Sequence, residues 1–277
     1  MPLRSGFAVV TPASRGLGFA IAQQLLALTN LPIIATARNE CGRLRDRLLE
    51  ESSEAQDAEK RLNVLRVDVT DEETVSDMAS KIRDTYPDTY LRIAITVPGI
   101  LHVEKSPAQI DAQKVLDSFK VNALGPLLLM KHLSSFLPNR SSPPFEDEKR
   151  EPSEADDTQF RLPSHAIYAM MAARVGSISD NSSGGWYSYR ASKASVYQLA
   201  KTFDLHLQSR SKERALAVAL HPGTVKTDFT RDYWDGRTML QPEESASRLL
   251  KFLSGMGNGA DEGRGRCWDW NGKEVLP

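Results

Sequence analysis

Short apolar runs alternate with helical patterns along the whole sequence, and this alternation limits the fold more than any other feature. The expected strands are residues 7–11, 32–37, 62–69, 91–97, 165–174 and 214–221, with a short one near 266–270. The expected helices are residues 17–28, 40–60, 74–86, 112–137, from about 187 onward, and 242–254, with a kink near Gly125 and Pro126. Because the strands are apolar throughout, they should be buried on both faces. The fold class is therefore α/β, a doubly wound parallel sheet with helices on both sides.

One segment interrupts the alternation. Residues 139–160 (NRSSPPFEDEKREPSEADDTQF) are rich in proline, serine and acidic residues and poor in apolar ones. We expect an exposed acidic loop inserted within a single domain of residues 1–277, since closing a longer loop costs little additional entropy. Such a passive loop would tolerate deletion of about residues 141–157. A regulatory or partner-binding segment is the alternative interpretation.

The composition argues against several classes of protein. The chain has 35 Lys and Arg residues against 36 Asp and Glu, so it should not have nucleic acid or an anionic membrane as its main partner. Cys41, Cys267 and five scattered histidines provide neither a disulfide framework nor a metal-binding cluster. The N-terminus lacks a signal-peptide pattern, and no apolar run approaches the ~18 residues of a membrane span. We therefore expect a cytoplasmic protein that binds no metal.

The turn after the first expected strand has the features of a phosphate-binding site. Small residues in TPASRGLG (Thr11 to Gly18) allow close backbone approach, and the following helix offers free N–H groups. The spacing differs from G-x-G-x-x-G, so a tight connection is the alternative. Arg38 ends the second strand, where NAD-binding folds carry an acid for the ribose, and Arg15 lies within the turn. Two guanidinium groups there favour a 2′-phosphate, and therefore NADP(H) over NAD(H).

Tyr189 and Lys193 lie four residues apart at the start of an expected helix (GGWYSYRASKA), so they share one helix face. A free tyrosine, with a pKa of about 10, is a poor base at neutral pH, and an adjacent cation lowers that pKa. The pair therefore suits proton transfer. A surface tyrosine stacked on a lysine stem is the alternative.

Taken in order, the motifs resemble those of the short-chain dehydrogenase/reductase superfamily over nearly the whole chain, and in particular its carbonyl-reductase-like branch, which includes C-factor-like proteins. The matching segments are TPASRGLG, RVDVTD, FKVNALGP, YRASKA and HPGTVKTDF. The resemblance implies a Rossmann-type fold, a small carbonyl or alcohol substrate, and a homodimer or homotetramer. The NADP-binding residues that it implies are Thr11, Ser14, Arg15, Gly16, Leu17, Gly18, Arg38, Asp68, Val69, Gly99, Asn122, Tyr189, Lys193, Pro222, Gly223, Val225 and Thr227.

The same resemblance implies four catalytic residues. Tyr189 would be the acid/base, and Lys193 would lower its pKa and bind the nicotinamide ribose. Ser177 would hydrogen-bond the substrate oxygen, and Asn122 would hold a water that links Lys193 to solvent. Ser177 is preferred to Ser179 because it directly follows the end of the fifth expected strand.

Two positions depart from the family's pattern. Pro12 replaces the first glycine of the phosphate turn, and TVPG (Thr96 to Gly99) replaces N-N-A-G. Because proline has no N–H to donate, we expect weaker cofactor binding and altered sheet anchoring rather than altered chemistry. Tyr233 and Trp234 are candidates either for covering the substrate or for anchoring their own loop.

The sequence thus predicts an NADPH-dependent oxidoreductase that reduces a ketone or aldehyde to an alcohol, or catalyses the reverse reaction. A dinucleotide-binding signalling or sensor protein with the same fold and little turnover is the alternative, which the two departures keep open. His221, directly before Pro222, is expected to be structural rather than catalytic.

Overall fold

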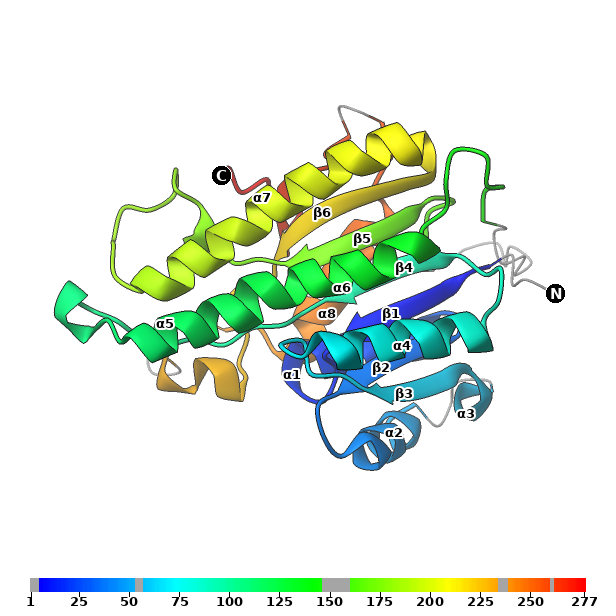
Figure 1. Cartoon of the computed structure of the whole chain (residues 1–277), viewed down its shortest axis with the longest axis horizontal. Coiled ribbons are helices and arrows are strands. Elements are labelled where there is room, and N and C mark those ends of the chain that lie inside the picture. Colours follow the sequence, from blue (N-terminus) through cyan, green and yellow to red (C-terminus); the bar gives the residue numbers. More distant parts are fainter. Residues whose placement is uncertain (1–4, 53–56, 146–159, 234–238, 260–261) are drawn as a thin grey trace.

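A seven-stranded sheet forms the centre of the computed structural model, which describes residues 5–52, 57–145, 160–233, 239–259 and 262–277 (Figure 1). The strand order is β3-β2-β1-β4-β5-β6-β7, and all neighbouring strands are parallel. The strands are β1 (Phe7–Thr11), β2 (Ile33–Ala37), β3 (Leu62–Arg66), β4 (Leu91–Thr96), β5 (Ala166–Met171), β6 (Ala215–His221) and β7 (Cys267–Asp269). The predicted doubly wound parallel sheet is confirmed.

Helices cover both faces of this sheet. They are α1 (Gly16–Leu28), α2 (Cys41–Glu50), α3 (Ala58–Arg61), α4 (Glu72–Thr85), α5 (Ala112–Phe119), α6 (Gly125–Leu133), α7 (Tyr187–Arg210) and α8 (Pro242–Ser254). α4, α6 and α7 lie on one face, and α1 and α8 lie behind the sheet (Figure 1). Along β1, Ala8 and Val10 pack with α1 and α8, whereas Phe7 and Val9 pack with α4 and α6. This burial on both sides explains why the strands are apolar throughout.

The chain reverses its winding direction between β1 and β4. β1 leads into α1 on one face of the sheet, and β4 leads into α5 and α6, of which α6 packs on the other. In sheets of this kind, the loops at the carboxyl ends of the strands separate at this point and leave a crevice for a ligand. The candidate site therefore belongs at the carboxyl edge of β1 and β4.

The long helix before β5 is interrupted slightly earlier than predicted. A π-helical turn spans Lys120–Leu124, and the Gly125 N–H bonds to the Lys120 carbonyl. A Cβ atom on Gly125 would lie 3.0 Å from Val69 Cγ2, so glycine lets the helix approach the loop after β3 closely. That loop begins earlier than predicted, because β3 ends at Arg66 rather than at Val69.

The predicted exposure of residues 139–160 holds at Arg140, Ser141, Pro143 and Pro144 but is wrong at Ser142 and Phe145. Phe145 is 7% exposed and belongs to the core, with its ring 5.2 Å from the guanidinium carbon of Arg92. Ser142 is buried as well. The prediction overlooked that one aromatic side chain can anchor an otherwise polar segment. Residues 146–159 lie outside the described part of the chain.

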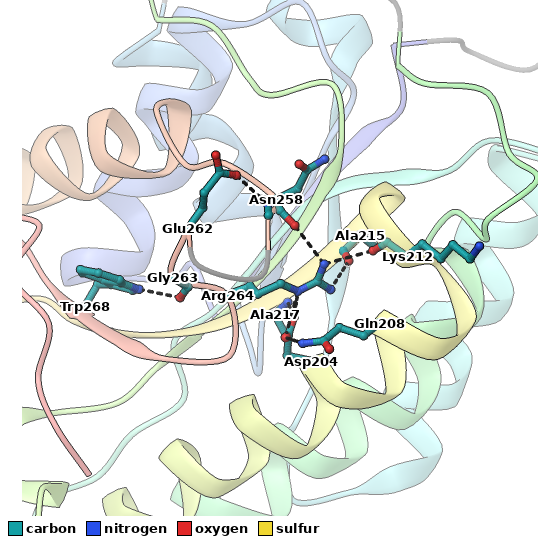
Figure 2. Close-up of polar contacts among 11 residues, drawn as sticks. Asp204, Gln208, Lys212, Ala215, Ala217, Asn258, Glu262, Gly263, Arg264 and Trp268 are labelled. Atoms are coloured by element: carbon teal, nitrogen blue, oxygen red, sulfur yellow. Dashed lines mark hydrogen bonds and ion pairs between the residues drawn. The ribbon is translucent and has the colours of Figure 1, made fainter.

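A buried ion pair ties the segment before β7 to the sheet (Figure 2). Arg264 Nε lies 3.0 Å from both carboxylate oxygens of Asp204 on α7. The guanidinium also donates to the carbonyls of Lys212, Asn258 and Ala215, at 2.9 to 3.1 Å. Asp204 also accepts a bond from the Ala217 N–H on β6. Both charges are therefore fully engaged although they are almost completely buried.

Candidate active site

The phosphate turn lies directly after β1, at the edge predicted for a ligand. Gly18 must be glycine, because a Cβ atom there would lie 2.1 Å from the Pro12 carbonyl oxygen. The close approach places the loop of Pro12 to Ser14 over the first turn of α1, whose leading N–H groups have no partner within the helix. Leu17 is buried, and Thr11 Oγ1 lies 2.6 Å from Thr36 Oγ1 on β2. The turn is thus fixed to the sheet, and its helix N-terminus is available to an anion.

Three arginines lie around this end of the crevice. Arg15, with a side chain 80% exposed, lies 4.0 Å from the Asp228 carboxylate. Arg38 contributes to a cavity of about 390 Å³ that Thr70, Ile100 and Val121 also line. Arg47 on α2 donates a bond of 3.4 Å to the Ser14 carbonyl and stacks over Phe19. Sequence reasoning missed Arg47, since nothing in the local pattern indicates that α2 reaches back to the phosphate turn.

Asp68 and Val69 follow β3 beside the same cavity. Burial works against ionisation of Asp68, whereas hydrogen bonds from the Thr70 N–H and hydroxyl favour the carboxylate. With the charges of Arg38 and Arg66, they hold the pKa of Asp68 below its usual value. The carboxylate therefore stays charged near Arg38, and Val69 packs against Gly125.

Lys193 occupies the centre of the site. It is 3% exposed, and its Nζ donates to the carbonyls of Met171 at 2.8 Å and Pro98 at 3.3 Å. Burial lowers the pKa of Lys193 to about 8. Although TVPG replaces the family's N-N-A-G, the Pro98 carbonyl thus still accepts a hydrogen bond from Lys193 Nζ. Sheet anchoring also persists, because the Val97 N–H bonds to the Thr11 carbonyl at 2.7 Å.

Asn122 lies in the π-helical turn and is fully buried. Its Oδ1 accepts from the Ile100 N–H at 2.8 Å, and its Nδ2 donates to the Ile100 carbonyl at 2.9 Å and to Ser192 Oγ at 3.0 Å. The side-chain amide therefore joins the loop after β4 to α7. Both of its polar atoms are engaged, so the side chain itself has little capacity left for the water expected from the resemblance.

Gly99 connects these residues. A Cβ atom built on it would lie 3.6 Å from Lys193 Nζ, 3.9 Å from Asn122 Oδ1 and 3.7 Å from the Phe229 ring. One backbone position thus lies beside the lysine, the asparagine and an aromatic ring. A side chain at position 99 would fill the space between the lysine, the asparagine and the Phe229 ring, so glycine keeps that space free.

Ser177 reaches the site through a backbone contact. A short 3-10 turn, Arg174–Gly176, follows β5, and a Cβ atom on Gly176 would lie 2.7 Å from the Lys193 carbonyl carbon. The loop therefore packs directly on the backbone of α7. Ser177 is 2% exposed, whereas the Ser179 hydroxyl is bonded to the Pro277 carbonyl. This difference supports the preference for Ser177.

Tyr189 lies among aromatic side chains. It is 6% exposed, and its ring centroid lies 6.2 Å from that of Trp186 and 6.0 Å from that of Phe229. Phe229 belongs to a 3-10 segment, Asp228–Tyr233, that follows the last family motif. The sequence analysis considered Tyr233 and Trp234 for this role, but the structure describes the side chain of neither. The sequence analysis missed Trp186 and Phe229.

The motif after β6 folds back onto the phosphate turn. Gly223 has a φ of +81°, and a Cβ atom there would lie 2.7 Å from the Trp270 ring, so both conformation and space require glycine. The Pro222 carbonyl accepts from Ser245 Oγ, and Val225 pairs with Leu240. Thr227 then lies against Gly16, whose built Cβ would be 3.1 Å from Thr227 Cγ2. The two ends of the predicted cofactor site are thereby brought together.

Among the described residues, no group of three or more His, Cys, Asp or Glu side chains is arranged so that it could hold a metal ion. His221 is half-buried at the end of β6, and the desolvation of its ring lowers its pKa to about 4. Within the described residues, no helix is long and apolar enough to cross a membrane.

Comparison with known proteins decides the family. A family model described as short chain dehydrogenase matches residues 6–142. The chain belongs to this family. A 1-hydroxy-2-glutathionyl-2-methyl-3-butene dehydrogenase of Rhodococcus sp. strain AD45 is 28% identical over 190 residues, covering 69% of this chain and 70% of that protein. The C-signal protein of Myxococcus xanthus is 28% identical over 183 residues, covering 66% and 90%.

The fold agrees with solved structures of short-chain dehydrogenases and reductases. The NADPH-bound carbonyl reductase from chicken fatty liver superposes with a TM-score of 0.77 over 100% of both chains, at 24% identity. At that identity the likeness shows the fold alone. The chain is thus a Rossmann-type member of an oxidoreductase family whose proteins use a nicotinamide dinucleotide.

Proposed function

We propose that this short-chain dehydrogenase is an NADPH-dependent carbonyl reductase that acts on apolar ketones or aldehydes. The contacts of Gly99 carry the proposal: the backbone there lies beside Lys193, Asn122 and Phe229, and Phe229 in turn packs near Tyr189. A candidate acid–base residue, a cation and an aromatic ring therefore lie around one glycine at the carboxyl edge of the sheet, the edge that also carries the phosphate turn.

The residues of the crevice fit a dinucleotide. The close contact at Gly18 leaves the N-terminus of α1 open to a pyrophosphate. Arg38 and the exposed Arg15 would hold a 2′-phosphate, and the cavity that Arg38 shares with Ile100 and Val121 would take the adenosine. Asp68 and Val69 would border the adenine, and Pro222, Val225 and Thr227 would line the nicotinamide side. The NADPH bound to the chicken carbonyl reductase also supports a preference for NADPH over NADH.

The bound cofactor would supply a hydride to the carbonyl carbon. Tyr189 would donate its phenolic proton to the carbonyl oxygen, which Ser177 would hold by a hydrogen bond, so that the carbonyl gains one hydride and one proton and becomes an alcohol. Lys193, protonated below about pH 8, would stabilise the phenolate left on Tyr189. Since the Asn122 amide is engaged, we assign the expected water to its backbone carbonyl. Alcohol oxidation would use the same residues in reverse.

The surroundings of Tyr189 favour an apolar substrate. Trp186 and Phe229 place two aromatic rings within 6.2 Å of the Tyr189 ring, measured between centroids. Aromatic walls bind apolar and aromatic groups well and provide few partners for charged ones. Aryl ketones and aromatic aldehydes should therefore be better substrates than small charged oxo acids.

Steady-state oxidation of NADPH with a panel of aromatic, aliphatic and charged carbonyl compounds tests this function. We expect turnover with NADPH that is highest for aromatic compounds. Tight NADPH binding without turnover of any of them would instead support the second candidate, a dinucleotide-binding signalling or sensor protein. The C-signal relative and the substitution at Pro12 keep that candidate open. A homodimer or homotetramer and a cytoplasmic location remain predictions.

A further inference from the structure

The hydroxyl of Ser177 is oriented by its own loop. Its Oγ accepts a hydrogen bond of 3.0 Å from the backbone N–H of Asp180. A hydroxyl has one hydrogen to donate and two lone pairs. Because the Asp180 N–H takes one of the lone pairs, the hydroxyl hydrogen remains free to point toward another acceptor. The Asp180 N–H therefore fixes one acceptor direction of Ser177 Oγ and so limits the directions in which the hydroxyl can donate.

Arg174 fixes that position from the other side of the loop. Its guanidinium lies 3.7 Å from the Asp180 carboxylate and 2.9 Å from the Asp269 carboxylate. Asp269 is a rigid anchor: it lies on β7, is 6% exposed, and accepts bonds from the N–H groups of Asn271 and Lys273. Arg174 thus links the loop that carries Ser177 to the last strand of the sheet.

The strengths of the two contacts differ. The Asp180 carboxylate is about half exposed, so its attraction to Arg174 is weak by itself. Asp269 is almost buried and close to Arg174, which holds the guanidinium in place. The weak contact between Asp180 and Arg174 can still select one loop conformation among several, because Asp269 already holds the guanidinium and the contact does not have to order it.

We propose that Arg174 is a positioning residue for Ser177, acting through Asp180. This inference rests on the proposed function, in which Ser177 holds the substrate oxygen. Arg174 does not touch the substrate in this account. It keeps the Asp180 N–H on Ser177 Oγ, so that the Ser177 hydroxyl donates to the carbonyl oxygen.

The first test compares Arg174→Met with Arg266→Met. Arg266 pairs with Glu274 at 3.1 Å in the same terminal part of the sheet but has no contact with the loop among its described bonds, so it is a matched control. We expect Arg174→Met to lower kcat at least fivefold with NADPH affinity within twofold of wild type. Arg266→Met should change neither by more than twofold. An unchanged kcat in Arg174→Met would overturn the proposal.

A double-variant cycle separates positioning from general loss of structure. In a Ser177→Ala background, measured by single turnover at high protein concentration, Arg174→Met should have less than a twofold effect, because the group it positions is gone. An equal loss in both backgrounds would contradict the proposal. If Arg174→Met does not fold, Asp180→Ala replaces it, since that variant leaves the Arg174–Asp269 pair intact. Asp180→Ala should lower the turnover rate threefold or more in the wild-type background. It should have no such effect in the Ser177→Ala background.

Hydrogen exchange gives a result that does not depend on turnover. Amides of residues 177–184 should exchange at least tenfold faster in Arg174→Met than in wild type, and should be unchanged in Arg266→Met. If the wild-type protein reduces no carbonyl compound, the proposed function fails, while this measurement still decides whether Arg174 orders the loop. Unchanged exchange in Arg174→Met would refute that ordering.

Discussion

Lys193 shows at the residue scale what the site requires of the fold. A protonated amine, 3% exposed, is bonded to two backbone carbonyls, and burial lowers its pKa from 10.5 to about 8. Below pH 8 the lysine is charged in the folded protein, and its desolvation lowers the free energy of unfolding by the full amount. Above 10.5 the side chain is neutral in the folded and the unfolded chain, and this cost is gone.

The stability of the protein should therefore rise with pH in the window where the unfolded chain binds the extra proton. Between pH 8 and 9.5, the free energy of unfolding should increase by about 1.5 kcal/mol relative to Lys193→Met, because the slope reaches about 1.4 kcal/mol for each pH unit only once the folded lysine has lost its proton. Denaturant unfolding of both proteins across this range measures the difference. A difference independent of pH would mean that Lys193 keeps its ordinary pKa.

Tyr189→Phe removes the phenolic proton and keeps the ring between Trp186 and Phe229. We expect kcat to fall by about 100-fold or more, within the range that proton transfer contributes, while NADPH affinity stays nearly constant. Tyr187→Phe is the matched control, because Tyr187 lies two residues earlier on α7 and is 40% exposed. Near-wild-type turnover in Tyr189→Phe would exclude it as the acid/base.

At the scale of elements, Phe145 shows why the polar segment before β5 cannot be removed as a whole. Phe145→Ala should destabilise the protein by about 3 kcal/mol, because it empties a buried site and removes the contact with Arg92. For a chain of this size the melting temperature should fall by about 6 to 12 °C. Phe119→Ala is the control, because the Phe119 side chain is 38% exposed, and it should change the melting temperature little. Equal effects of the two would mean that Phe145 adds nothing to the core.

The ion pair of Figure 2 holds α7, β6 and the segment before β7 together. Arg264→Met leaves the buried carboxylate of Asp204 without its cation, so a loss of about 3–5 kcal/mol is expected. Arg43→Met, which breaks an exposed pair with Glu40, should cost less than about 0.5 kcal/mol. Adding Asp204→Leu should restore only part of the loss, since three carbonyls still lack their donor. Full recovery would show that those carbonyl bonds add no stability.

The elements themselves were largely predictable. Continuous apolar runs identified β1, β2, β4 and β6 to within a residue, because burial on both faces leaves no room for polar side chains. The end of β3 was not predictable. Val67 and Val69 are as apolar as strand residues, but they lie in the loop after β3 and belong to the same hydrophobic cluster as α6. The π-helical turn at Asn122 was not predictable either. It depends on contacts with Ile100 and Ser192, which lie far away in the sequence.

At the scale of the whole molecule, the sheet order explains why the candidate site residues could be predicted and their partners could not. Parallel strands place their carboxyl ends at one edge, so residues that follow β1, β4, β5 and β6 meet there wherever they lie in the chain. The supporting contacts come from other elements: Arg47 on α2 reaches Ser14, and Phe229 covers Gly99. No local pattern records such contacts, since they depend on the lengths of loops and the packing of helices.

Cofactor binding should stabilise the whole molecule, because the dinucleotide would contact the loops after β1, β2, β3, β4 and β6 at once. At a concentration 100 times its Kd, NADPH adds about 2.7 kcal/mol, which corresponds to a rise of about 5 to 10 °C in melting temperature. A charge-assisted contact between Arg38 and a 2′-phosphate contributes about 1.5–3 kcal/mol, so NADH should bind about ten- to a hundredfold more weakly and give a clearly smaller rise.

Arg38→Ala should then reduce the rise produced by NADPH to about that of NADH and leave the effect of NADH unchanged. Arg43→Ala, an exposed arginine of α2, is the control and should preserve the difference between the cofactors. Thermal unfolding with each cofactor measures all three proteins without any substrate. Equal shifts with NADPH and NADH in the wild-type protein would remove the basis for NADP specificity. A loss of both shifts in Arg38→Ala would assign Arg38 to a part of the dinucleotide that the two cofactors share.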